Sequence, residues 1–217
     1  MTTRFCNKAL LIRACLCISL LGTVWVTVGH AQVGSPQSDR DIVKILVAYH
    51  SLTGNTENMA RGVVEGAQAV PGSVVIMKRV GDVTADLLFS SDAVIVGSPV
   101  YWSNMAGAIK SFFDDWQFKF GVFPEFKMKN KVGAAFATGG QVSSGKEVTM
   151  LTILAAMLRN KMIVVSEGGA FGASASTEGA SPGIDEEEFA SAKALGQRVA
   201  EVAKMVKRGQ NVNNVLE

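Results

Sequence analysis

Cysteine is missing from most of this 217-residue sequence, because Cys6, Cys15 and Cys17 all lie near the N-terminus. The chain after residue 31 is therefore expected to have no disulfide, no thiol nucleophile and no cysteine metal site. An excess of charge of one sign is also missing, since 21 basic and 19 acidic residues give a formal net charge of +2. A chain so close to neutral gives no general reason to expect a nucleic-acid partner.

Residues 1–31 contain no Asp or Glu and have the pattern of an export signal. Arg4 and Lys8 precede an uncharged apolar run over 14–29, and Gly29-His30-Ala31 offers small residues at a cleavage site. The run is short for a bilayer span of about 20 residues, so a cleaved signal is predicted. An uncleaved N-terminal membrane anchor and a buried helix are the alternatives. With the charges before the run, we expect an exported chain, periplasmic or membrane-anchored facing the periplasm, that meets the membrane only through this segment.

From residue 42 onward, apolar runs alternate with helical patterns, as in βαβ units. Residues 32–41 are polar and predict a linker, 42–208 a single domain, and 209–217 a polar tail. Strands are predicted over 42–49, 73–77, 93–96, 132–137 and 162–166, and helices over 54–70, 105–116, 145–158 and 185–206, with a glycine-rich loop over 168–183. This order predicts an α/β fold, a flavodoxin-like three-layer sandwich around a five-stranded parallel sheet of order 2-1-3-4-5.

The loop over 51–56, between the first strand and the first helix, has the donors of a phosphate site. It has no Lys after its glycine, unlike a Walker loop, and it is not the dinucleotide motif G-x-G-x-x-G. A helix N-terminus at the carboxyl end of a parallel strand presents unpaired N–H groups to an anion. Ser51, Thr53 and Thr56 add hydroxyl groups, and Gly54 lets the backbone come close. The alternative is that these residues only cap the helix.

Two further loops are expected at the same edge of the sheet. After the third strand, Pro99 stiffens a turn that places Tyr101 and Trp102 where aromatic side chains can cover a flavin ring. Packing of both rings on the following helix is the alternative. After the fourth strand, Gly139 and Gly140 suggest close backbone approach to the polar edge of such a ring, with a flexible turn as the alternative.

Two other aromatic features have a functional and a structural interpretation. His50, the only histidine after residue 31, is more readily a packed or exposed strand-end residue than a phosphate or proton-transfer group. Aromatic side chains between the third helix and the fourth strand form either a quinone platform or ordinary packing at a helix or subunit interface, which we favour. They are Trp116, Phe118, Phe120, Phe123 and Phe126.

Three segments, 49–60, 96–113 and 132–154, resemble the flavodoxin-like NAD(P)H:quinone oxidoreductases related to WrbA. The most specific pieces are the stretch Gly-Ser-Pro-Val-Tyr-Trp-x-Asn-Met-Ala-Gly that starts at Gly97 and the triplet Gly145-Lys146-Glu147. The resemblance extends over 44–207. Two positions depart from the family pattern, because Thr53 stands where a tyrosine is frequent and Asn160 where a histidine helps to bind FMN.

The resemblance implies an FMN-dependent enzyme that takes electrons from NAD(P)H and passes two to a quinone. The cofactor carries this chemistry, so no catalytic side chain and no metal are expected. A flavodoxin-type electron carrier without a nicotinamide site is the first alternative, and a partner-binding domain without flavin is the second. A homo-oligomer, either a dimer or a tetramer, is also implied. The residues expected to bind FMN are Ser51, Leu52, Thr53, Gly54, Asn55, Thr56, Pro99, Val100, Tyr101, Trp102, Thr138, Gly139, Gly140 and Gln141.

Overall fold

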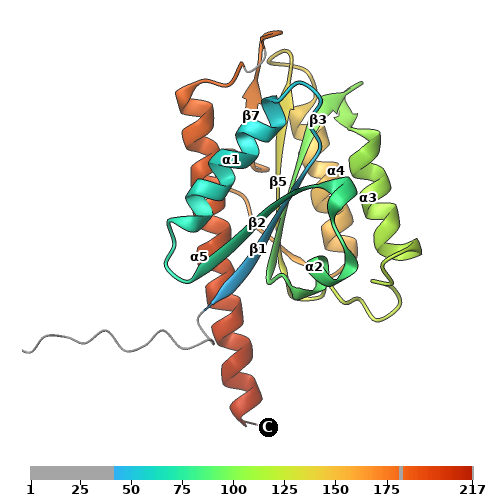
Figure 1. Ribbon diagram of the computed structural model, residues 1–217, viewed down its shortest axis with the longest axis vertical. Coiled ribbons are helices and arrows are strands. Elements are labelled where there is room, and N and C mark those ends of the chain that lie inside the picture. Colours follow the sequence, from blue (N-terminus) through green and yellow to red (C-terminus); the bar gives the residue numbers. More distant parts are fainter. Residues whose placement is uncertain (1–41, 181–182, 217) are drawn as a thin grey trace, which may run out of the picture. The chain divides into compact units, whose positions relative to one another are not determined.

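The computed structural model describes residues 42–180 and 183–216 (Figure 1). The predicted export segment over 1–31 and the linker over 32–41 lie outside the described residues. Among the residues that are described, no helix is both long and apolar enough to cross a membrane.

A parallel sheet forms the middle layer of the domain (Figure 1). Its main strands are β1 (Val43–Tyr49), β2 (Ser73–Arg79), β3 (Ala93–Tyr101) and β5 (Val132–Gly139). They lie in the order β2-β1-β3-β5, and the short strand β6 (Ile163–Val164) follows β5. The predicted flavodoxin-like order is therefore confirmed.

Two short strands share the fifth position of the sheet. β6 pairs with the beginning of β5 at Val132 and Gly133. β7 (Ala173–Ser176) pairs with the end of β5, from Phe136 to Gly139. The glycine-rich loop predicted over 168–183 thus contains a strand, which small Ala and Ser side chains, with their low strand propensity, do not announce.

Helices cover both faces of the sheet (Figure 1). One face packs against α1 (Asn55–Gln68) and α5 (Glu186–Leu216), and the other against α3 (Gly107–Phe118) and α4 (Lys146–Arg159). The short α2 (Ala85–Ser90) follows a 3₁₀ turn at Val80–Asp82 and was not predicted. α5 runs ten residues past the predicted end at Val206, so most of the predicted polar tail over 209–217 is helical.

The apolar run of β1 has a direct structural reason. Ile45 and Val47 pack toward α1 and α5, whereas Leu46 and Ala48 pack toward α3 and α4. A strand that is covered on both faces needs apolar side chains at successive positions, in place of the alternation of a half-exposed strand.

The parallel strands give the sheet two distinct edges. We call the carboxyl edge the one where β1, β3 and β5 end, and the amino edge the one where they begin. The helices run back from the first edge to the second, so α3 and α4 begin at the carboxyl edge and end at the amino edge.

Candidate functional site

The three loops singled out in the sequence meet at the carboxyl edge. β3 lies between β1 and β5, and Pro99 of β3 is in register with Thr138 of β5. The hydroxyl oxygens of Thr56 and Thr138 lie 2.8 Å apart, in a buried hydrogen bond between the first loop and the third. Open parallel sheets bind their ligands at this edge.

The loop over 51–56 makes a tight turn into α1. Gly54 has a φ of 89° and is the N-cap of α1, and its N–H donates to Ser51 Oγ at 3.1 Å. The N-cap residue has no side chain and therefore forms no side-chain cap. Ser51 bonds the N–H of this residue, so helix capping and phosphate binding both stay predictions for the loop, which lies at the positive end of the α1 dipole.

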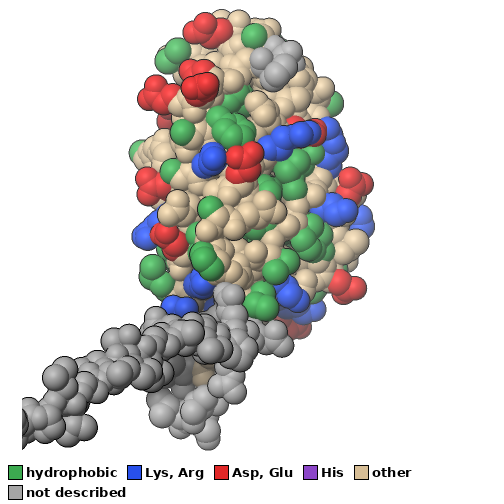
Figure 2. Space-filling model, turned by 60° about the vertical axis from the view of Figure 1, so that its left-hand side comes forward, with side chains coloured by type: hydrophobic (Ala, Val, Ile, Leu, Met, Phe, Trp, Pro, Cys, Tyr) green, Lys and Arg blue, Asp and Glu red, His purple; other side chains and the backbone are tan. Residues whose placement is uncertain are grey.

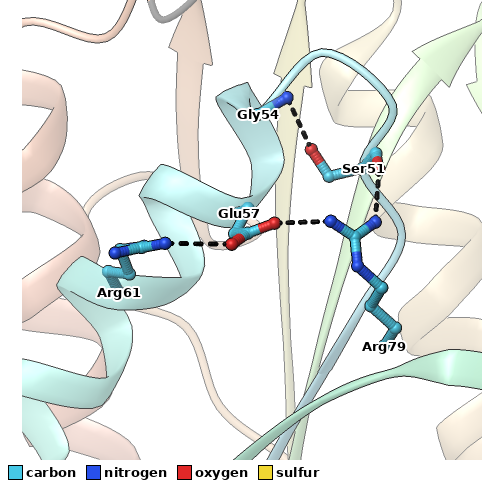
Figure 3. A network of polar contacts seen from close by, with 5 residues as sticks. All are labelled: Ser51, Gly54, Glu57, Arg61 and Arg79. Carbon is cyan, nitrogen blue, oxygen red and sulfur yellow. Dashed lines mark hydrogen bonds and ion pairs between the residues drawn. The ribbon is translucent and has the colours of Figure 1, made fainter. Parts of the chain in front are cut away.

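A network of charged side chains contacts the first loop and stabilises it (Figure 3). Arg79, at the end of β2, donates to the carbonyl of Ser51 at 2.6 Å and to Glu57 Oε2 at 2.6 Å. Arg61 donates to the other Glu57 oxygen at 3.0 Å. The hydrogen bond from Arg61 and the charge of Arg79 lower the pKa of Glu57, so this carboxylate stays ionised and holds both arginines in place.

The second loop is a β-hairpin that presents two aromatic rings. Val100 and Tyr101 of β3 pair with β4 (Asn104–Met105), which leaves Trp102 and Ser103 as the two turn residues. Both have positive φ, 51° and 60°, as a type I′ hairpin turn requires. Trp102 is fully exposed at 101%, and Tyr101 is 39% exposed. The alternative in which both rings pack on the following helix is therefore wrong for Trp102.

The base of this hairpin is held by a buried hydroxyl. Ser98 Oγ accepts a hydrogen bond from the Ala106 N–H at 2.9 Å and donates to the Pro99 carbonyl at 2.7 Å. Ser98 is fully buried, so these bonds fix where the exposed turn leaves the sheet.

His50 joins the first loop to the second. Its ring meets the Tyr101 ring edge-on, with 6.3 Å between the ring centroids. Burial, together with the positive charge of Arg79, lowers the pKa of His50, which favours the neutral imidazole. The structure therefore supports packing as its role, here against a neighbouring loop.

One buried lysine stabilises the third loop through hydrogen bonds. Lys146, the first residue of α4, is 5% exposed. Its ammonium donates to the carbonyls of Gln141 and Val142 at 3.3 and 3.2 Å and bonds the hydroxyl of Ser176. These bonds hold Gln141 and Val142 in place, which argues against a freely flexible turn.

A fourth segment, described over 176–180 and at Gly183, also reaches the site and was not predicted. Asn55 donates to the Ala180 carbonyl at 3.0 Å and accepts from the Gly183 N–H at 2.9 Å. The Thr177 N–H donates to the Gly139 carbonyl at 2.8 Å. The separation of 125 residues between Asn55 and Ala180 hides this contact from local sequence patterns.

The carboxyl edge has room and donors for a phosphorylated ring. A hollow of about 460 Å³ lies between the third loop and the loop after β7, lined by Gly140, Gln141, Val142, Glu178 and Gly179. The Thr56–Thr138 pair shares one hydrogen bond between two hydroxyl groups, so one proton is left to donate. Ser144 also keeps a buried hydroxyl without a partner among the described residues. These features fit FMN, whose phosphate needs donors and whose ring needs a flat apolar cover.

Two other sequence features lie away from this edge. Asn160 follows the last residue of α4, and 14 residues of helix place it about 20 Å from the third loop. Its amide donates to the Ala156 carbonyl at 2.8 Å, so it does not reach the proposed FMN site of its own chain. It lies just before β6, where the resemblance puts the family histidine, and that match stays a prediction.

The aromatic cluster is also remote from the first loop. Trp116 is buried against Phe112 and Phe113, with ring centroids at 5.7 and 4.9 Å, and Phe118 ends α3 at the amino edge. This position supports ordinary packing in preference to a platform beside the flavin. A larger hollow of about 530 Å³ lies between α3 and α4, but it includes none of the expected FMN-binding residues.

Comparisons with known proteins agree with this geometry. Residues 80–176 match the family model described as NADPH-dependent FMN reductase. A flavodoxin of Clostridium saccharobutylicum is 31% identical, over 76% of this chain and 99% of the relative. An NAD(P)H dehydrogenase (quinone) of Geotalea daltonii is 30% identical, over 74% of this chain and 97% of the relative.

A solved structure extends the similarity to three dimensions. The flavodoxin, WrbA-like protein from Agrobacterium tumefaciens superposes with a TM-score of 0.65 at 25% identity, over 75% of this chain and 98% of that one. The whole length of these relatives thus corresponds to the described domain. The resemblance seen in the sequence is confirmed, and the chain belongs to the flavodoxin-like NAD(P)H:quinone oxidoreductase family related to WrbA.

Proposed function

We propose that this chain is an FMN-dependent oxidoreductase that takes electrons from NAD(P)H and delivers two of them to a quinone. The observation that carries the proposal is the convergence of the loop over 51–56, the β3–β4 hairpin and the loop after β5 at one edge of the sheet. The family relatives named for NAD(P)H and quinone support the choice of donor and acceptor.

The first loop would hold the FMN phosphate. The N-terminus of α1 supplies N–H groups and a positive partial charge, and Ser51, Thr53 and Thr56 supply hydroxyl groups. The loop also contains Gly54, which has a positive φ, and Leu52, whose side chain is exposed. Asn55 contributes through its bonds to the 176–183 segment, which it holds against the loop.

The second and third loops would hold the ring. Tyr101 and Trp102 offer apolar faces, and Pro99 and Val100 set the position of the turn. Backbone N–H groups of the third loop, from Thr138 through Gly139 and Gly140 to Gln141, would face the polar edge of the ring. When bound, FMN supplies the two-electron redox chemistry, and the protein supplies binding and orientation.

Anaerobic reduction tests this function directly. NADH or NADPH, mixed with the FMN-loaded protein in a stopped-flow instrument, should bleach the yellow absorbance, and a quinone added afterward should restore it. Failure of both nicotinamides to bleach bound FMN would exclude the nicotinamide-dependent enzyme.

A flavodoxin-type electron carrier is the second candidate. The 31% identity to a flavodoxin over nearly its whole length favours it. A carrier would exchange electrons with protein partners and would keep bound FMN oxidised in the presence of NADH or NADPH alone. Protein that purifies without colour and takes up no FMN would instead indicate a partner-binding domain without flavin.

We also propose that the chain is exported through residues 1–31 and that it assembles as a homodimer or homotetramer. The basic and apolar pattern of that segment supports export, with a periplasmic location. N-terminal sequencing of the mature protein should find Gln32 first if the segment is cleaved. Light scattering during size-exclusion chromatography should give two or four times the mass of one chain, and a monomer would contradict the assembly.

A further inference from the structure

The amino edge of the sheet has a polar pocket that the proposed function does not use. It has a volume of about 220 Å³ and lies between the loop that leads into β5 and the second half of α5. We call it the amino-edge pocket. It is lined by Asp92, Lys127, Lys129, Asn130, Lys131, Ala203, Val206, Lys207 and Gln210.

Positive charge exceeds negative charge in the amino-edge pocket. Four of its residues are lysines, and Asp92 is its one carboxylate. Asp92 Oδ2 already accepts from the Lys207 ammonium at 2.9 Å and from the Lys44 backbone N–H at 2.8 Å. This carboxylate is thus paired with Lys207, and its charge also acts on Lys131, so four lysines share one counter-ion in the pocket.

The remaining lysines are held in different ways. Lys131 donates to the carbonyls of Phe89 and Ser91 at 2.8 and 2.5 Å, and burial lowers its pKa. Lys127 lies over the Phe89 ring, with its ammonium 5.0 Å from the ring centroid. Lys129 is exposed and forms no ion pair within the described part of the chain. Ammonium groups brought together without an anion repel one another, and an anion between them would remove that cost.

We propose that the amino-edge pocket binds a phosphate group, as a second anion site at the opposite edge of the sheet from the first loop. Lysine ammonium groups bind phosphate as point charges, and the side-chain amides of Asn130 and Gln210 add neutral donors. Figure 2 shows Lys and Arg side chains interspersed with Asp and Glu over the face it presents. The phosphate is either a free ion or the headgroup of a phospholipid.

Two probes distinguish these sources. Inorganic phosphate is titrated into the FMN-saturated full chain at constant ionic strength, so that bound FMN blocks the first loop. Vesicles containing phosphatidylglycerol are compared with vesicles of phosphatidylcholine alone, using residues 36–217. That part forms one compact unit, and the solved WrbA-like chain, 98% of which superposes on 75% of this chain, has the same fold without further segments.

Paired variants locate the binding. K127Q/K129Q should weaken binding of the active probe about tenfold or more, since each lysine near an anionic surface contributes about fivefold. K78Q/K193Q removes the same charge from other exposed positions and should change binding less than about twofold, because salt screens distant charges. A thermal melt of each variant verifies folding, and K129Q alone replaces the double variant if that one unfolds.

Every outcome bears on the proposal. Phosphate binding lost in K127Q/K129Q supports a free-ion site, and vesicle binding that needs phosphatidylglycerol and is lost in K127Q/K129Q supports a lipid headgroup. Binding of neither probe overturns the proposal. Equal loss in both double variants, or equal binding to neutral vesicles, overturns it as well, because each shows attraction that does not depend on this pocket.

Discussion

At each edge of the sheet, one lysine side chain donates hydrogen bonds to loop carbonyls, but the two loops have different roles. At the carboxyl edge, Lys146 is buried and donates to the carbonyls of Gln141 and Val142. At the amino edge, Lys131 is half-buried and donates to the carbonyls of Phe89 and Ser91. Both lysines fix a loop, but only the first fixes one that borders the proposed FMN site.

What lies beside each lysine also differs. The carboxyl edge has a helix N-terminus, an exposed hairpin and a hydroxyl pair, which are neutral donors and apolar cover. The amino edge has further lysines around one engaged carboxylate. Each lysine therefore stabilises the conformation of a loop, and the neighbouring groups determine which ligand that edge can bind.

Replacement of Lys146 and Lys131, one at a time, should show most clearly how the two edges differ. Lys146→Met and Lys131→Met each remove charge-assisted hydrogen bonds to carbonyls, so each should lower the free energy of unfolding by about 2 kcal/mol, measured by urea denaturation. Only Lys146→Met should also weaken FMN binding, because only its loop borders the proposed site. Equal loss of FMN affinity in both variants would contradict the separation of the two edges.

The exposed aromatic residues give a second, smaller contrast. Trp102→Ala should weaken FMN binding by about 1 kcal/mol, the contribution of one stacked aromatic ring, and leave the melting temperature unchanged. Phe118→Ala, which removes a ring that is 80% exposed at the amino edge, is the matched control and should change neither quantity. FMN fluorescence quenching measures both affinities, and unchanged binding in Trp102→Ala would remove Trp102 from the site.

The ion pairs of Glu57 should have a modest, pH-dependent effect. Since its pKa is lowered from 4.5, the stabilisation is complete above pH 4.5 and is lost as the pH falls through the folded-state pKa. Glu57→Gln should cost about 0.5 kcal/mol at neutral pH and should remove this acid sensitivity in melts across the pH range. Asp114→Asn, which breaks an exposed pair with Lys110, is the control. A wild-type acid profile in Glu57→Gln would show that other carboxylates govern it.

The smallest expected effect concerns His50. Its pKa is lowered from 6.5, so the unfolded chain takes up its proton first and the free energy of unfolding should fall as the pH drops below 6.5. NMR titration of the His50 ring should give a midpoint below 6.5. Removal of the covering ring in Tyr101→Ala should shift the midpoint upward, and an unshifted midpoint would show that burial by Tyr101 is not the cause.

Most of the fold was predictable because its signals are local. The apolar run of β1 and the glycines that end β5 stand out in the sequence, and the structure places both as expected. β7 was hidden because Ala-Ser-Ala-Ser has little strand propensity and is held by its pairing with β5. The hairpin at Trp102 was also hidden, since its turn lacks the Asn-Gly pair that usually marks type I′ geometry.

The candidate site was predictable only in part, because some of its contacts have no local sequence signal. Loops that follow neighbouring parallel strands must meet, so residues of three loops could be grouped from the strand order alone. The bonds from Asn55 to the 176–183 segment and from Lys146 to Ser176 depend on tertiary packing.

The central claim is that the carboxyl edge binds FMN through the first loop. Fluorescence titration of flavin-free protein with FMN tests it, in the wild type and in Thr56→Val, which removes one hydroxyl of the buried pair with Thr138. The account predicts saturable binding of one FMN per chain and an affinity about tenfold or more lower in Thr56→Val, the effect of losing one hydrogen bond to a charged group. No uptake of FMN by the wild type, or equal affinity in a folded Thr56→Val, would contradict it.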